Sequence, residues 1–232
     1  MGGKVVQVVG HDGSFSAYLA MPEGTPKAGI VVIQEIFGVN AVMRDITDSY
    51  AAQGYAALCP DLFWRIEPNV QLSDKSDEEW KRAMALMNAI DPDKGVDDID
   101  ASIDYLRDQI GVAKVGAVGF CLGGMLAFLA AARTDVDASV SYYGVNLDKR
   151  LEEAEKLAQP LMLHIAGKDK FVSPAAQEAI KAGLHNHPQV TINVYDAQDH
   201  AFAREGGAHY DAQAAELANR RTADFFRDHL AA

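Results

Sequence analysis

The sequence contains few cysteines, no cluster of basic residues and no long apolar run. Its 232 residues include two cysteines, Cys59 and Cys121, and this low number excludes a disulfide-rich secreted scaffold. The net charge is -12, so neither nucleic acid nor an anionic membrane is an expected partner. No apolar run reaches the length of a membrane span. We therefore expect a soluble metabolic protein that acts on a small molecule.

Motifs for metals, phosphates and secretion are also missing. There is no H-E-x-x-H sequence and no paired C-x-x-C, and the fully spaced glycine-rich phosphate loops do not occur, so we predict no metal and no cofactor. The first residues lack the apolar core of a signal peptide. We expect a monomer in the cytoplasm.

Continuous apolar runs alternate with helical patterns along the chain, which is typical of a mostly parallel sheet with helices on both faces. About eight strands are predicted, the first two as a hairpin, so that residues 1–232 form one α/β domain. The predicted strands are 5–9, 16–20, 29–34, 55–59, 114–119, 138–143, 161–166 and 191–195. The predicted helices are 41–53, 77–90, 95–109, 122–133, 148–158, 174–184 and 210–230. The polar stretch 67–77 is the longest predicted loop, and loops of this length often border a site.

Cys121 stands in a G-x-C-x-G sequence that joins the predicted strand 114–119 to the predicted helix 122–133. This arrangement is typical of a nucleophile elbow, in which flanking glycines prevent collisions in a strained turn. The N-terminus of the following helix would favour a thiolate and any oxyanion formed beside it. The pattern predicts Cys121 as a nucleophile.

An acid and a base follow in the order found in α/β-hydrolase triads. Asp169 comes just after the strand 161–166, and His200 comes just after the last strand. Alone, such an aspartate is usually a turn former and such a histidine is usually surface. Together with the elbow, the order and the strand ends predict a triad of Cys121, Asp169 and His200.

Several motifs now give the chain a specific resemblance: QEIFGVN at 34–40, QGYAA at 53–57, CPDL at 59–62, GFCLGG at 119–124, YYGV at 142–145 and HAFAR at 200–204. The chain resembles the dienelactone hydrolases, an α/β-hydrolase family also called carboxymethylenebutenolidases. The resemblance implies the α/β-hydrolase fold, the same triad, and hydrolysis of a lactone or ester through an acyl-enzyme. It also implies an oxyanion hole formed by the backbone N–H groups of Ile36 and Leu122.

The resemblance assigns Glu35 the control of thiol ionisation. Glu35 follows the apolar strand 29–34, where a carboxylate could accept the proton of Cys121 and so gate its activity. The alternative is a solvated acid at a strand end. Cys59 is expected to be a buried, inert thiol.

The substrate pocket departs from the family pattern. At the position where the family has an arginine that binds the substrate carboxylate, this sequence has Trp80. At the position of a family tyrosine it has Met84. Trp80, Met84 and Met87 share one helix face, which is either core packing or an apolar pocket wall. Arg204 matches the second carboxylate-binding arginine of the family, and Tyr142 is a further candidate for substrate binding. A broader carboxylesterase or thioesterase on the same triad, and a noncatalytic ligand-binding protein of this fold, remain as alternatives.

Overall fold

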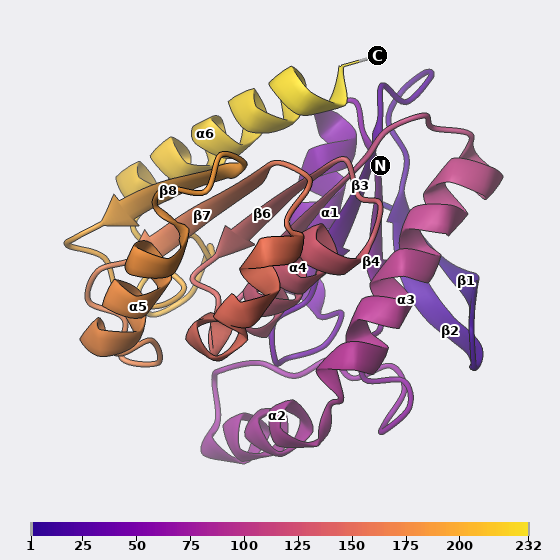
Figure 1. Cartoon of the computed structure of the whole chain (residues 1–232). Coiled ribbons are helices and arrows are strands. Elements are labelled where there is room, and N and C mark those ends of the chain that lie inside the picture. The colour runs from indigo at the N-terminus through magenta and orange to yellow at the C-terminus, as the bar shows by residue number, and fades with distance from the viewer. Residues whose placement is uncertain (1, 232) are drawn as a thin grey trace.

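The computed structural model describes residues 2–231, which build one eight-stranded sheet in the order β1-β2-β4-β3-β5-β6-β7-β8 (Figure 1). β1 and β2 form an antiparallel hairpin, β2 is antiparallel to β4, and all other neighbours are parallel. The strands are β1 (Lys4–Gly10), β2 (Gly13–Ala20), β3 (Gly29–Ile33), β4 (Ala56–Pro60), β5 (Val115–Phe120), β6 (Ala138–Tyr142), β7 (Leu161–Ala166) and β8 (Val190–Tyr195). The predicted α/β fold and the opening hairpin are confirmed.

Helices cover both faces of the sheet (Figure 1). They are α1 (Ala41–Ala52), α2 (Asp77–Ala89), α3 (Pro92–Tyr105), α4 (Leu122–Arg133), α5 (Pro174–Leu184) and α6 (Ala212–Leu230). α1 and α6 lie on one face, where the rings of Tyr50 and Phe226 pack with centroids 6.2 Å apart. α3, α4 and α5 lie on the other face, and α2 stands apart beyond the strand ends (Figure 1). Because β3, β4, β5, β6 and β7 are covered on both sides, their residues are almost all buried and apolar.

Two predicted helices differ from the structure in kind or extent. The predicted helix 95–109 begins earlier, at Pro92, because the Asp91 side chain accepts a hydrogen bond from the Asp93 N–H at 2.9 Å and proline fits the first helical position. It continues as a π-helical turn, Leu106–Ile110, and ends at Gly111, whose φ of 82° suits glycine. The predicted helix 148–158 is a 3-10 helix, Leu147–Lys156. The other predicted helices match within two residues.

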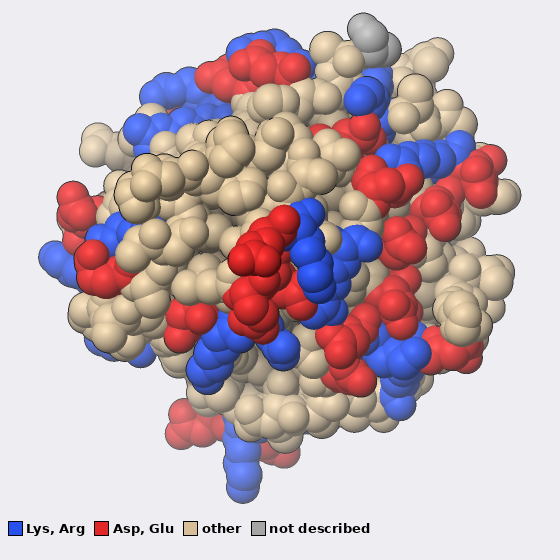
Figure 2. All heavy atoms as spheres, in the orientation of Figure 1, with Lys and Arg blue, Asp and Glu red and all other residues tan. Residues whose placement is uncertain are grey.

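The surface carries charges of both signs. In the view of Figure 2, Lys and Arg side chains lie among Asp and Glu side chains, without a continuous basic surface on that face. Within residues 2–231, none of the helices combines the length and the apolar character that a membrane crossing requires.

Candidate active site

Cys121 lies between β5 and α4 in a strained backbone conformation, with φ of 57° and ψ of -114°. Three hydrogen bonds hold this turn in place. The Cys121 N–H donates to the Tyr142 carbonyl at 3.0 Å, and the Cys121 carbonyl accepts from the N–H groups of Gly124 at 3.0 Å and Val145 at 3.2 Å. The strain is therefore maintained by the ends of two neighbouring elements, β6 and α4, and the sulfur is fixed at the edge of the sheet.

The glycines of the elbow are required by close backbone contacts. A Cβ at Gly119 would lie 1.8 Å from the Gly123 carbonyl oxygen, and a Cβ at Gly123 would lie 2.4 Å from the Ile33 carbonyl oxygen. Backbone atoms cannot move aside as a flexible side chain can. The G-x-C-x-G pattern thus has a steric cause in this fold.

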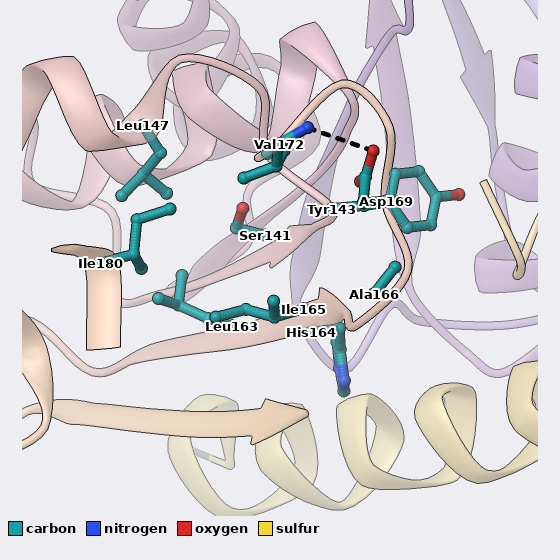
Figure 3. Close-up of a pocket in the computed structure, with 11 residues that line it drawn as sticks. Ser141, Tyr143, Leu147, Leu163, His164, Ile165, Ala166, Asp169, Val172 and Ile180 are labelled. Carbon is teal, nitrogen blue, oxygen red and sulfur yellow. Dashed lines mark hydrogen bonds between the residues drawn. The ribbon is translucent and has the colours of Figure 1, made fainter. Parts of the chain in front are cut away.

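His200 and Asp169 form the rest of the predicted triad. His200 Nδ1 lies 2.7 Å from Asp169 Oδ2. The other carboxylate oxygen of Asp169 accepts hydrogen bonds from the N–H groups of Phe171 at 2.8 Å and Val172 at 3.3 Å, the second of which Figure 3 shows. Cys121, Asp169 and His200 are 8%, 4% and 7% exposed. The carboxylate is held in one orientation, and it orients the imidazole.

The environment of His200 favours the protonated imidazole once Cys121 is ionised. Burial lowers its pKa, but in the state with an ionised Cys121 the charge of the sulfur, hydrogen bonds with Asp169 and with the sulfur, and the Asp169 charge together raise the pKa of His200 to about 10. A proton that leaves the sulfur therefore has a basic site beside it. The rings of Phe171 and Tyr143 pack edge-on against the imidazole, with centroids at 4.8 Å and 5.1 Å.

The predicted oxyanion-hole residues lie next to the nucleophile in sequence or in the pocket: Leu122 follows Cys121, and Ile36 is a pocket residue. Leu122 is the first residue of α4, so its N–H precedes the helical hydrogen-bond ladder. Ile36 lines the pocket together with Cys121. Neither N–H donates a hydrogen bond to any residue between 2 and 231. Both are thus free to donate to an oxygen that carries developing negative charge.

Glu35 and Arg204 are paired with one another. Arg204 Nη1 donates to Glu35 Oε2 at 3.0 Å, and Arg204 Nη2 donates to Asp74 Oδ2 at 2.6 Å. Glu35 is buried, and its Oε1 has no hydrogen-bond partner among the described residues. Asp74 belongs to the loop 67–77, so this loop does border the site. Sequence reasoning missed Asp74, because an acid in a polar loop carries no signal of its own.

The pocket in front of Cys121 has a volume of about 210 Å³, and Phe37, Trp80 and Phe171 form an aromatic part of its wall. Trp80 lines it and packs against Phe37 and Phe171, with ring centroids 5.7 Å and 6.0 Å away. Met84 and Met87 do not line this pocket and pack against the hydrophobic core. The three residues on this face of α2 therefore have two different roles. Trp80 forms part of the pocket wall, whereas Met84 and Met87 pack against the core.

The structure does not place Tyr142 in the pocket. Its side chain is buried, and its hydroxyl hydrogen-bonds to Thr222 and Asn219 of α6 at 2.7 Å and 2.9 Å. The prediction that Tyr142 binds substrate is therefore corrected. Side chains of a strand alternate between the two faces of the sheet, and that of Tyr142 points to the face covered by α6. The next residue, Tyr143, has a φ of 39° and packs against His200. Its buried hydroxyl has no partner among the described residues.

A second cavity lies behind Asp169, and it is too small for a substrate. Its volume is about 10 Å³, and its lining is mostly aliphatic, including Leu147, Leu163 and Ile180 (Figure 3). His164 points away from it toward α6 (Figure 3). The pocket that contains Cys121 and His200 is the candidate active site.

Comparison with known proteins agrees with this geometry. The sequence profile of the Dienelactone hydrolase family matches residues 15–230. The chain belongs to this family. A protein of Azospirillum brasilense named "Putative carboxymethylenebutenolidase" is 56% identical over 225 residues, covering 95% of this chain and 96% of that protein. The carboxymethylenebutenolidase of Pseudomonas putida is 41% identical over 222 residues, covering 95% of this chain and 94% of its own.

A solved structure shares the fold over the same extent. The "Putative Dienelactone Hydrolase" of Klebsiella pneumoniae superposes with a TM-score of 0.85 at 25% identity, covering 96% of this chain and 97% of that one. The chain is thus a dienelactone hydrolase-like hydrolase of the α/β-hydrolase fold.

Proposed function

We propose that this protein hydrolyses a lactone or ester through an acyl-enzyme on Cys121. The observation that carries the proposal is the meeting of Cys121 and His200 in one pocket, with His200 Nδ1 held by Asp169 at 2.7 Å. A nucleophile, a base and a group that orients the base are the parts that covalent acyl transfer requires.

The reaction follows from the position of each group. His200 takes the proton of the Cys121 thiol, and the thiolate attacks the carbonyl carbon. The N–H groups of Ile36 and Leu122 stabilise the oxyanion. When the intermediate collapses, the carbon–oxygen bond to the alkoxide breaks and the alkoxide takes the proton from His200. His200 then removes a proton from water, and the hydroxide attacks the thioester. The carboxylic acid leaves as the thiolate is released, and the sulfur takes the proton back from His200.

Glu35 is proposed to control ionisation of the thiol. It lies in the same pocket as Cys121, and its unpartnered Oε1 is available to accept a hydrogen bond from the thiol, while its charge disfavours the thiolate until the proton moves to His200. We expect a free enzyme that holds a neutral thiol and ionises it when substrate enters. The ultraviolet absorbance of the thiolate, measured against pH for the free protein and for Glu35→Gln, tests this role. A fully ionised Cys121 at neutral pH would contradict it.

Replacement of Cys121 tests the covalent scheme. Cys121→Ala is expected to lower kcat by at least about 10⁴-fold, since the nucleophile is lost. Cys59→Ala is the matched control, because Cys59 is also buried and free but lies on β4, outside the pocket. Mass spectrometry after rapid acid quench should show an acyl adduct on Cys121 of the unaltered enzyme. Substantial turnover by Cys121→Ala would overturn the proposal.

A carboxylesterase or thioesterase with a broader substrate range is the second candidate. The aromatic wall formed by Trp80, Phe37 and Phe171 favours it, because such a wall accepts many apolar acyl groups.

We also propose a cytoplasmic monomer. The free thiols of Cys59 and Cys121 support a reducing compartment, and sedimentation of the purified protein tests the monomer.

A further inference from the structure

Arg204 is engaged by two carboxylates at once. One terminal nitrogen donates to Glu35 at 3.0 Å and the other to Asp74 at 2.6 Å. The guanidinium also lies over the Phe37 ring, 5.4 Å from its centroid, and the Arg204 side chain is only 14% exposed. A carboxylate entering the pocket would have to displace one of these acids in order to form a bidentate pair with the guanidinium.

The fold holds the segment that leads to Asp74 independently of Arg204. The Leu72 N–H donates to the Phe37 carbonyl at 2.9 Å, and Asn40 Nδ2 donates to the Leu72 carbonyl at 2.9 Å. Gln71 forms an isolated antiparallel bridge with Gly38. The loop is thus tied to the segment that follows Glu35. A displaced Asp74 would remain close to the guanidinium and compete with any anion bound there.

The charges of the pocket lining disfavour an anion. Glu35 and Asp74 are acidic, and Arg204 is the one Lys or Arg side chain among the described residues that line the pocket. Asp169 adds a buried negative charge behind His200. A substrate carboxylate would therefore meet a surplus of negative charge in a partly buried site, where screening by water and salt is reduced. An uncharged acyl group meets aromatic faces instead.

We propose that Asp74 is a specificity-determining residue that occupies Arg204 and so directs the site toward uncharged esters and lactones. The inference rests on the proposed hydrolytic function, and it adds the class of substrate. Asp74 acts through Arg204 and does not take part in the bond-making steps.

Two esters of the same chain length, one ending in a methyl ester and the other in a carboxylate, test the inference. The p-nitrophenyl ester of monomethyl glutarate is neutral, and the p-nitrophenyl ester of glutaric acid carries a carboxylate at the same chain length. The unaltered enzyme should have the higher kcat/KM for the neutral ester. Asp74→Asn keeps the shape and an oxygen that can accept from Arg204 but removes one charge. It should raise the ratio of anionic to neutral kcat/KM by about 10-fold or more, and less at high salt.

Asp77→Asn is the matched control, because Asp77 is an exposed acid of the first turn of α2 and makes the same change in net charge. Its ratio should stay within about twofold of the unaltered enzyme. The inference is overturned if the unaltered enzyme prefers the anionic ester, or if Asp74→Asn changes the ratio no more than Asp77→Asn does.

Binding in a background without turnover separates this inference from the proposed function. In Cys121→Ala, calorimetry should show weaker binding of phenylacetate than of phenylacetamide, and adding Asp74→Asn should strengthen phenylacetate binding about 10-fold. If no ester is hydrolysed but this shift occurs, the proposed function fails and the inference stands. If esters are hydrolysed through Cys121 and the shift is absent, the inference fails and the function stands.

Discussion

The two halves of the active site are built in different ways. In the nucleophile half, Asp169 binds His200, and Cys121 sits in a turn whose backbone is fixed by β6 and α4. In the substrate half, Glu35 and Asp74 each bind Arg204 through side chains. The first half depends on strand ends and backbone contacts, and the second depends on a loop. The comparison shows why one scaffold can keep its reaction while its substrate changes.

The largest effect is expected in the nucleophile half. Asp169→Asn should lower kcat about 10³-fold or more, because an amide no longer stabilises the imidazolium or fixes its tautomer. Asp199→Asn is the control, since Asp199 accepts a hydrogen bond from the backbone N–H of His200 at 2.8 Å and does not touch the ring nitrogens. Steady-state kinetics of both variants should separate them. Equal losses would mean that loop position, and not ring orientation, limits the rate.

A buried histidine beneath the nucleophile half should give the protein a pH-dependent stability. His164 is fully buried on β7, where its ring nitrogens bind Tyr195 and Thr222 at 2.9 Å. Burial, with a contribution from the charge of Arg221, lowers the pKa of His164 from 6.5 to about 3. The unfolded chain binds this proton first, so the contribution of His164 to stability is complete above pH 6.5 and declines as the pH falls toward 3.

His164→Gln removes this pH dependence. The difference in free energy of unfolding between the unaltered protein and the variant should shrink by about 2 kcal/mol between about pH 7 and pH 5. Denaturant titrations at the two pH values measure it. His185→Gln, at an exposed position, should leave the acid dependence unchanged. If the free energy of unfolding of His164→Gln depends on pH as that of the unaltered protein does, His164 takes up its proton as readily in the native protein as in the unfolded chain.

The smallest expected effect separates the two roles of the α2 face. Trp80→Ala should raise KM for a neutral aryl ester about 10-fold with little change in kcat, because an aromatic wall of the pocket is lost. Met84→Ala should change KM by less than about twofold and lower the stability instead, since Met84 packs against the core. If both variants raise KM equally, the helix face acts as one surface and the division described above is wrong.

The sequence predicts the nucleophile half better than the substrate half for a physical reason. Cys121, Asp169 and His200 each follow a predicted strand, and the carboxyl ends of parallel strands lie at the same edge of the sheet. The sheet, the helices and these positions could therefore be predicted from the sequence. The triad roles remain predictions that kinetics must test.

The substrate half depends on geometry that no pattern encodes. Asp74 reaches Arg204 only because bonds between Leu72, Phe37 and Asn40 fold its loop across the site. Tyr142 was expected to bind substrate, yet it is Tyr143 that lies beside His200. The conformation of the turn after β6, where Tyr143 has a φ of 39°, determines that Tyr143 and not Tyr142 lies beside the catalytic pocket. The 3-10 character of Leu147–Lys156 was missed for a similar reason, since it depends on local turn geometry and not on the apolar pattern.

Phe37, Asp74 and Arg204 line both the catalytic pocket of about 210 Å³ and an adjoining, more open hollow of about 340 Å³. The partition between them is thus made of side chains. Substitution of Asp74 by a small residue is expected to widen the passage between the two spaces, because only Phe37 and Arg204 of the three shared side chains would remain. A substrate group too long for the present pocket would then extend between the charged side chains that line the hollow, so this position offers a way to lengthen the acceptable substrate without altering the backbone.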